Sequence, residues 1–266
     1  MTGIERVAQT FASCRAQGRA ALMPYFTLGY PDPEQSLAVI RSIAAAGADL
    51  IELGVPFSDP LADGPTIQHS AQVALDHGMT TRRCLDMVAA LRAGGMTQPL
   101  LLMGYVNPIL AYGIPGYVAD AVAAGADGLI VPDLPPEEAG ELEAACREGG
   151  AALVYLLAPT SGAEHACAVA ARATGFLYLV SLTGVTGARG ALPADLSGFI
   201  TRVRQVTSLP LAVGFGISTP EHVRQVGRQA DGVIVGSALI SAVGAASDPA
   251  AAAGEFVARL RAALPN

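Results

Sequence analysis

The sequence predicts an α/β fold, a (β/α)8 TIM barrel with an extra N-terminal helix. Short runs rich in Val, Ile and Leu alternate with helical patterns along the chain. Strands that are apolar on both faces and separated by helices are typical of a parallel sheet covered by helices. Eight such units after one extra helix fit a closed barrel, with residues 1–266 as a single domain. An open, doubly wound sheet is the alternative.

The elements follow in order from local signals. Residues 1–17 alternate polar and apolar side chains and lack the continuous apolar stretch of a signal peptide, so they predict an amphipathic helix. Asp32 and Pro33 supply an N-cap and a first-turn proline for a helix over 34–46. Pro24 lacks the N–H that a strand ladder uses, so the first strand is expected to begin at or after it. The expected strands cover residues 22–28, 49–53, 100–104, 128–132, 152–157, 176–181, 210–214 and 232–235.

Two further patterns bear on the organisation of the chain. Residues 45–54, 123–132 and 229–236 each read as a helix end, a Gly or Asp turn and a strand. Such an echo favours repeated units over two unlike domains. Residues 93–119 carry no charge, but prolines and glycines interrupt them. They predict a strand, a loop and a helix start rather than a membrane span.

Composition narrows the function classes. The net charge is −7 and there is no basic run, so nucleic acid and anionic membranes are poor partners. The four cysteines form no CxxC pair, and the histidines lack zinc spacing. We therefore expect free, buried thiols in a reducing cytoplasm and no metal. All 16 basic residues are Arg. Without lysine, the chain cannot form a Schiff base or anchor pyridoxal phosphate, so no cofactor of its own is expected.

Two carboxylates stand out near the second strand. Glu52 lies inside an apolar run, and alternation along the strand points it into the barrel mouth, where burial raises a carboxyl pKa toward the range useful for acid–base chemistry. The alternative is a Glu paired with Arg in the barrel wall, although no Arg lies on an expected strand. Asp63 lies in a turn rich in Pro and Gly, where Asp also serves as a turn former.

Glycine-rich stretches follow the last strands. Residues 212–221 and 233–239 each place glycines between a strand end and a helix start, which is typical of a phosphate site in a barrel, although glycine also serves tight turns. The loop 181–193 is long and contains three glycines. Its place at the working face predicts a lid, with a plain connection as the alternative.

Taken together, these residues resemble the α subunits of tryptophan synthase over essentially the whole chain. The resemblance lies in PYFTLGYPD (24–32), LIELGVPFSDPLADGPTIQ (50–68), GLIVPDLP (128–135), GVTGARGALP (184–193) and GFGIS (214–218). It implies a barrel that cleaves indole-3-glycerol phosphate to indole and glyceraldehyde 3-phosphate. Positions 25 and 103 hold Tyr and Met, where other members of the family can carry Phe or Leu.

The resemblance also implies roles for single residues. Glu52 is the general acid and base, Asp63 stabilises the charged indole nitrogen, Tyr178 lies beside Glu52, and Thr186 lies on the lid. The implied indole slot consists of Tyr25, Met103, Ile130 and Phe215, and the implied phosphate site of Gly187, Gly216, Gly236 and Ser237.

A partner is implied as well. Members of this family pair with a pyridoxal-phosphate-dependent β subunit in an αββα complex, which points to docking around Pro56, Asp59 and Asn107. Without the resemblance, this loop could equally be stiffened only to hold Asp63. A stand-alone indole-releasing lyase, a catalytically silent barrel that only activates the β subunit, and a phosphosugar isomerase barrel are the alternatives.

Overall fold

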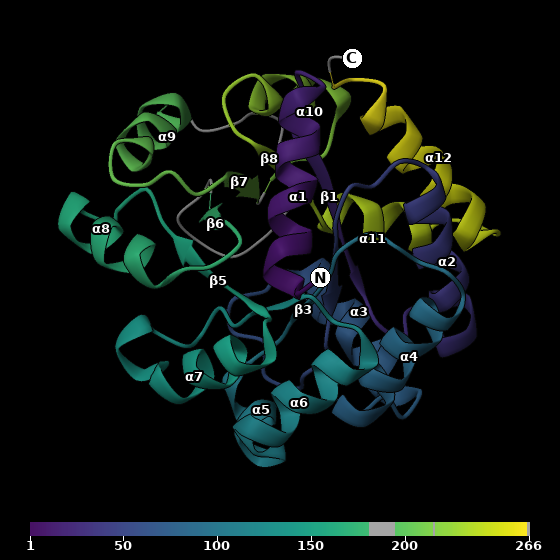
Figure 1. The fold of residues 1–266 in the computed structure, drawn as a ribbon. Helices are drawn as coiled ribbons and strands as arrows, with labels where there is room; N and C mark the ends of the chain where they lie inside the picture. The colour runs from purple at the N-terminus through teal and green to yellow at the C-terminus, as the bar shows by residue number, and fades with distance from the viewer. Residues whose placement is uncertain (181–194, 215, 265–266) are drawn as a thin grey trace.

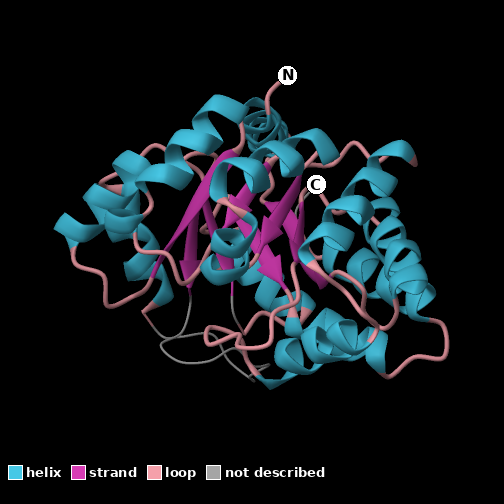
Figure 2. Ribbon diagram, turned by 90° about the horizontal axis from the view of Figure 1, so that it is seen from below, coloured by secondary structure: helices cyan, strands magenta, loops and turns pink. Residues whose placement is uncertain are grey.

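Eight parallel strands close into a barrel in sequence order, which confirms the expected fold (Figures 1 and 2). The structure, a computed structural model, describes residues 1–180, 195–214 and 216–264. Strand β1 pairs with both β2 and β8, so no edge is left open. The strands are β1 (Ala21–Thr27), β2 (Ile51–Gly54), β3 (Leu100–Met103), β4 (Gly128–Ile130), β5 (Ala152–Leu157), β6 (Leu177–Val180), β7 (Leu211–Gly214) and β8 (Gly232–Val235).

Helices surround the barrel and bury their apolar faces against it (Figure 1). In the described parts of the chain they are α1 (Gly3–Ala16), α2 (Pro33–Ala45), α3 (Pro65–Asp76), α4 (Thr81–Ala93), α5 (Val106–Tyr112), α6 (Ile114–Ala124), α7 (Gly140–Gly149), α8 (Ala163–Arg172), α9 (Leu196–Arg204), α10 (Pro220–Gly227), α11 (Ser237–Gly244) and α12 (Pro249–Arg261), with a 3-10 turn η1 (Pro136–Glu138).

The expected helix starts are confirmed by their caps. Thr2 and Glu5 form a capping box at the start of α1, each side chain bonding the other residue's backbone N–H. Asp32 caps α2 by accepting a 2.9 Å hydrogen bond from the backbone N–H of Gln35. Helix α1 lies across the N-terminal end of the barrel, which leaves the opposite end, where the strands finish, for the βα loops (Figures 1 and 2).

The expectation for Pro24 is wrong, because β1 begins three residues earlier, at Ala21. Leu22 and Leu28 direct backbone hydrogen bonds toward β2, and Pro24 falls on the same side by alternation. Pairing with β2 starts only at Tyr25, whereas β8 pairs with β1 from Ala21 onward. The missing N–H of Pro24 therefore falls just before the β2 ladder, where the strand tolerates its loss.

The sequence echo corresponds to a repeated clamp at the N-terminal end of the barrel. Asp49, which precedes β2, donates its N–H to the carbonyl of Leu22 and accepts the N–H of Leu22 at its side chain, at 2.9 and 2.8 Å. The same double link joins Asp127 to Leu100 and Asp231 to Leu211. Before β6, the even-numbered strand that lacks the echo, Thr174 makes the same link to Leu153. Each clamp fixes an even-numbered strand to the odd-numbered strand before it.

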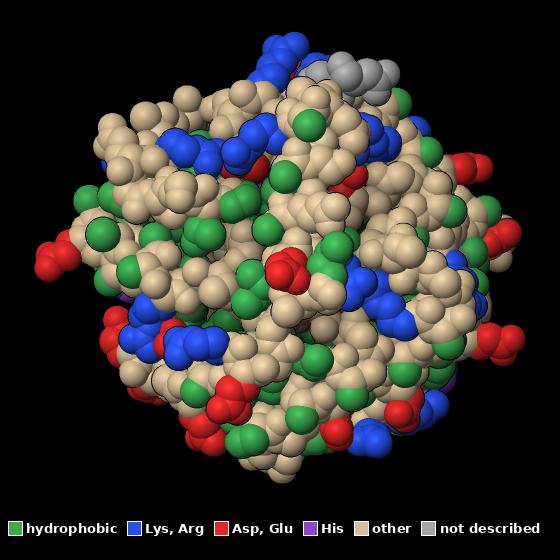
Figure 3. Space-filling view, in the orientation of Figure 1, with side chains coloured by type: hydrophobic (Ala, Val, Ile, Leu, Met, Phe, Trp, Pro, Cys, Tyr) green, Lys and Arg blue, Asp and Glu red, His purple; other side chains and the backbone are tan. Residues whose placement is uncertain are grey.

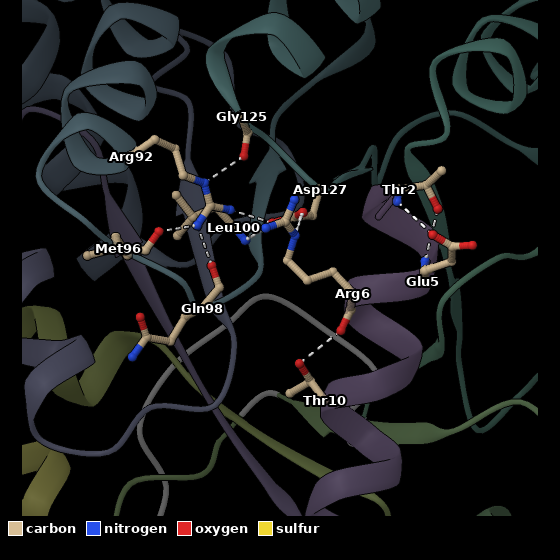
Figure 4. A network of polar contacts seen from close by, with 10 residues as sticks. All are labelled: Thr2, Glu5, Arg6, Thr10, Arg92, Met96, Gln98, Leu100, Gly125 and Asp127. Carbon is tan, nitrogen blue, oxygen red and sulfur yellow. Dashed lines mark hydrogen bonds and ion pairs between the residues drawn. The ribbon is translucent and has the colours of Figure 1, made fainter.

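Arginines connect these clamps to helix α1. Asp127, which is 1 % exposed, binds Arg92 from α4 and Arg6 from α1, as Figure 4 shows. Arg15 of α1 binds Asp231 at 3.2 Å in the same way. Arginine side chains gather around α1 on this face (Figure 3). Arginines are favoured at the N-terminal end of the barrel, because helices antiparallel to the strands end there and the last turn of a helix favours cations.

The uncharged segment 93–119 contains the expected strand, β3, and the start of α6, but most of the expected loop between them is the helix α5. No helix in the described part of the chain is long and apolar enough to cross a membrane. All four cysteines are free, and three are buried, but Cys167 is exposed, so the expectation of burial is wrong for it. Cys167 lies on α8, which buries only Ala166 and Val169, so the helix turns its thiol to solvent.

Candidate active site

Glu52 occupies the second position of β2, and its side chain is 0 % exposed. Neither carboxylate oxygen has a hydrogen-bond partner among the described residues, which excludes the alternative of a pair with arginine there. Burial raises the pKa of Glu52 to about 8, because the charged form loses its water without gaining a partner. A carboxyl in this state keeps its proton at neutral pH and is poised to donate it.

Asp63 reaches the same end of the barrel from the loop after β2. Its N–H donates to the carbonyl of Pro60 at 3.0 Å and its carbonyl accepts from the Gln68 side chain at 2.8 Å, so its backbone is held in the turn while its carboxylate is free to act elsewhere. Its carboxylate is 8 % exposed. Burial raises the pKa of Asp63 to about 6, although a hydrogen bond from Tyr105 opposes this shift.

Tyr105 is the functional residue that the sequence reasoning missed. It follows β3, and its hydroxyl donates to Oδ2 of Asp63 at 2.8 Å. The Tyr105 hydroxyl oxygen also accepts the N–H of Ala62 at 3.1 Å. Its ring packs on Phe57, with centroids 5.4 Å apart. The available signal was a tyrosine directly after a barrel strand, at the end where the loops gather.

Two tyrosines reach over glycines on the neighbouring strand. A Cβ on Gly54 would lie 2.0 Å from the Tyr25 hydroxyl, and one on Gly214 would lie 2.3 Å from the Tyr178 hydroxyl. Each glycine stands two residues beyond the register partner of its tyrosine, since Tyr25 pairs with Glu52 and Tyr178 with Ala212. Burial raises the pKa of Tyr178, and the charge of Glu52 adds to this shift. Both hydroxyls therefore need a strand without a side chain beside them.

A cavity of about 450 Å³, including its opening to solvent, lies at this end of the barrel, a size that suits a small ligand. Its lining includes seven of the residues that the sequence singled out. Glu52 and Ile130 are buried and are not part of its lining. The lining consists of Tyr25, Asp63, Ile67, Met103, Tyr178, Gly216, Ile217, Ile234, Gly236 and Ser237.

The glycine-rich stretches form one side of this cavity. Gly216 has φ +77°, which favours glycine, and Thr219 caps α10 shortly after it. Gly236 is the N-cap of α11 and Ser237 is its first residue. Two helices thus begin beside the cavity, and the first backbone N–H groups of a helix have no partner within it and suit an anion.

The loop expected to dock a partner follows β2, at the end of the barrel where the strands finish. Asp59 and Asn107 are exposed and Pro56 is half-buried. Leu61 and Leu110, on the same loop and on α5, are 86 % and 56 % exposed. Thr186, Gly187 and Phe215 lie outside the described residues, as does the loop 181–193. Where the structure is described, no group of three His, Cys, Asp or Glu could hold a metal ion.

Comparison with known proteins agrees with this geometry. The sequence profile described as tryptophan synthase alpha chain matches residues 11–263. The chain belongs to the tryptophan synthase alpha chain family. A tryptophan synthase alpha chain from Roseiflexus castenholzii is 54% identical over 256 residues, which is 96% of each chain.

Solved structures of this family share the fold. A chain of tryptophan synthase from Mycobacterium tuberculosis superposes with a TM-score of 0.91 at 38% identity and covers 98% of both chains. Tryptophan synthase subunit alpha from Legionella pneumophila gives 0.89 at 39% identity, with 97% of both chains covered. The α reaction of this family is the cleavage of indole-3-glycerol phosphate, which makes the chain a carbon–carbon lyase of tryptophan biosynthesis. A small-molecule substrate and a β-subunit partner follow from this family.

Proposed function

We propose that Glu52 and Asp63 divide the work of this cleavage. Their environments separate their pKa values, to about 8 for Glu52 and about 6 for Asp63. At neutral pH, Glu52 therefore holds a proton while Asp63 is ionised. Two carboxyl groups whose surroundings push their pKa values apart are a common basis for separate acid and base roles. The observation that carries the proposal is a fully buried Glu52 that has no hydrogen-bond partner among the described residues, together with an Asp63 that Tyr105 holds in place.

The reaction then follows as a retro-aldol cleavage. Glu52 gives its proton to the indole ring carbon that bears the glycerol chain, and Asp63 stabilises the positive charge that develops at the ring nitrogen. As the carbon–carbon bond breaks, its electrons return to the ring. The glycerol hydroxyl becomes the aldehyde and its proton passes to Glu52. The enzyme ends as it began, and indole and glyceraldehyde 3-phosphate leave. This route needs no lysine, and the chain has none.

We also assign the binding groups. Tyr25, Met103, Ile130 and Phe215 form the slot for the flat indole ring. Tyr178 and Thr186 act beside the two carboxylates. The phosphate binds backbone N–H groups at Gly187, Gly216, Gly236 and Ser237. An acidic chain can hold a phosphate in this way because the donors are local backbone groups that need no nearby cation.

We further propose that the chain acts as a single domain in the cytoplasm. Its partner is a pyridoxal-phosphate-dependent β subunit, bound in an αββα complex around Pro56, Asp59 and Asn107. Leu61 and Leu110, close to these residues in the sequence, are exposed and add an apolar component, which supports a protein partner. A partner that favours the ordered loop also favours the position of Asp63, which should raise turnover.

The test is an indole-release assay with indole-3-glycerol phosphate, with and without the β subunit. We expect measurable release by the chain alone and a faster reaction in the complex. Glu52→Gln should lose about 10²–10⁴-fold in kcat, the usual value of a positioned acid or base, and Asp63→Asn should also be severely impaired. Wild-type rates in the folded variants would remove these residues from the mechanism. No release in either state would support the silent barrel, and no change with the β subunit would support the stand-alone lyase.

A further inference from the structure

A chain of three buried hydroxyl groups starts at Tyr25 and leads away from the carboxylates. The Tyr25 hydroxyl lies 3.4 Å from Oγ1 of Thr27, which lies 2.7 Å from Oγ of Ser70 on α3. Ser70 in turn donates to the carbonyl of Ile67 at 2.8 Å. Thr27 and Ser70 are both 0 % exposed. No step of the proposed reaction uses this chain of hydroxyl groups.

The end of the chain fixes the direction of every proton in it. A carbonyl can only accept, so the Ser70 proton points to Ile67 and the Ser70 oxygen must accept from Thr27. With its own proton committed, Thr27 can only accept from Tyr25. The Tyr25 proton therefore points to Thr27, and the Tyr25 oxygen keeps a lone pair for another donor. The link from Tyr25 is the longest of the three and thus the weakest.

The surroundings of Tyr25 show which group its hydroxyl proton could reach if it did not point to Thr27. Tyr25 pairs in register with Glu52, so both side chains point to the same face of the sheet, and the Tyr25 hydroxyl lies over Gly54, two residues further along β2. The charges of Asp63 and Glu52 both act on this hydroxyl. Asp63 already accepts a hydrogen bond from Tyr105, whereas neither oxygen of Glu52 has a described partner.

We propose that Thr27 and Ser70 are positioning residues that keep the proton of the Tyr25 hydroxyl turned toward Thr27 and away from Glu52, so that Glu52 retains its own proton. A hydroxyl that donates to a carboxylate favours its charged form. The three linked hydroxyl groups prevent Tyr25 from donating to Glu52 in this way. The benefit for catalysis rests on the proposed role of Glu52 as the proton donor.

Other ionisable groups face the same space and act on the same titration. They come from the loop after β2, from the end of β3 and from β6, and are Asp63, Tyr105 and Tyr178. None of them changes when Thr27 or Ser70 is replaced. Substitutions in the hydroxyl chain therefore isolate the contribution of the Tyr25 proton.

The experiment is a ¹³C NMR titration of side-chain carboxyl groups in the full chain, with the Glu52 signal assigned by its loss in Glu52→Gln. Thr27→Val should free the Tyr25 proton to turn to Glu52 and lower the pKa of Glu52 by about one pH unit. Ser70→Ala should act in the same direction, because Thr27 then has no serine acceptor and can donate to Tyr25. Tyr25→Phe should change the pKa little, and Thr27→Val with Tyr25→Phe should behave like Tyr25→Phe alone.

Ser36→Ala is the matched control, since Ser36 is also a fully buried serine, but bonds the N–H of Gly29 outside this chain. It should leave the Glu52 titration unchanged. An unchanged pKa in both Thr27→Val and Ser70→Ala, or a lowered pKa that persists in the double variant, would overturn the proposal. The titration needs no turnover, so it stands apart from the proposed function. If the pKa pattern is found but Glu52→Gln releases indole at the wild-type rate, the catalytic role fails and the hydroxyl chain remains.

Discussion

Tyr105 donates a hydrogen bond of 2.8 Å from its hydroxyl to Oδ2 of Asp63. This contact joins the end of β3 to the loop after β2, and the same hydroxyl accepts the N–H of Ala62. One side chain thus fixes two consecutive residues of a loop that has no regular structure between Val55 and Gly64. The position of the second carboxylate is set by a neighbouring strand, and not by its own loop alone.

Replacing Tyr105 by Phe should therefore impair the reaction without unfolding the barrel. The Asp63 carboxylate loses a hydrogen bond that favours its charged form, so its pKa should rise above about 6. If ionised Asp63 is required, the acid limb of the pH profile of kcat/KM should move to higher pH. A lost hydrogen bond to a charged group corresponds to roughly a 10–100-fold fall in kcat/KM.

Tyr112→Phe is the control for this substitution. Tyr112 also donates from its hydroxyl to an aspartate, Asp120, but on α5 and α6 and outside the cavity lining. It should leave the pH profile in place. An acid limb that moves equally in both variants would show that the Tyr105 contact does not set the Asp63 titration.

Buried Glu52 should make the protein less stable as the pH rises. Its folded pKa of about 8 exceeds the ordinary value of 4.5, so the folded state holds a proton that the unfolded state releases. The free energy of unfolding should therefore fall between about pH 4.5 and about pH 8 because of this group. Glu52→Gln removes the titration. It should become more stable than the wild type by a few kcal/mol in alkaline solution.

Glu143 should change the stability of the protein with pH in the opposite direction. Arg172 binds it and lowers its pKa. The stability that this contact gives is present at neutral pH and is lost as the pH falls through the lowered pKa. The deficit of Glu143→Gln should thus be largest at neutral pH and shrink in acid. Urea denaturation of the variants and the wild type across the pH range measures both differences. A gap between Glu52→Gln and the wild type that does not grow with pH would contradict the raised pKa.

The clamp at Asp127 should contribute strongly to stability. This carboxylate is 1 % exposed, accepts the N–H of Leu100 and binds Arg92 and Arg6. Asp127→Asn keeps the shape but leaves the charge of the half-buried Arg92 without its counterion. A loss of about 3 kcal/mol in the free energy of unfolding is expected.

Asp86→Asn is the comparison, since its 3.8 Å pair with Arg82 is exposed on both sides. That variant should change the free energy of unfolding by less than about 0.5 kcal/mol. Similar losses of stability in Asp127→Asn and Asp86→Asn would contradict a special role for the clamp.

The barrel itself could be predicted because each of its signals is local. Apolar runs, caps such as Asp32 and the spacing of the units are all readable along the chain, and every expected strand exists. The echo at Asp49, Asp127 and Asp231 was also visible. Its meaning was not, because the clamp partner lies on the neighbouring strand. Pro24 was misjudged for the same reason. Whether a missing N–H matters depends on which strand lies beside it and where that strand begins.

The candidate site divides in the same way. Glu52 could be identified because a charged residue inside an apolar strand is unusual, and this signal is visible within a few residues of sequence. Tyr105 and Ser70 were missed, since nothing near them in sequence reveals that one meets Asp63 and the other ends the hydroxyl chain of Tyr25. Contacts between separate βα units are settled only when the barrel closes, and they position the groups that the sequence alone identifies.

The cavity glycines give the last prediction. Gly216 lines the cavity with φ +77°, and we assign the phosphate to backbone N–H groups there. Gly216→Ala should weaken the binding of glycerol phosphate, because a methyl group crowds the approach of an anion to those groups. The positive φ adds a cost of about 1–2 kcal/mol in the folded state for any side chain at this position. A binding defect must therefore be separated from a loss of stability.

Gly18→Ala makes that separation. Gly18 has φ +71°, nearly the same backbone conformation, and a Cβ there would meet nothing within 4 Å. Both variants should lose similar stability in thermal unfolding. Only Gly216→Ala should raise the Kd of glycerol phosphate, by about 10-fold for a penalty of about 1.4 kcal/mol, as measured by calorimetry. If the two variants bind glycerol phosphate as the wild type does, the phosphate lies elsewhere. If both bind it more weakly, the defect comes from strain, and Gly216 holds no special place in the site.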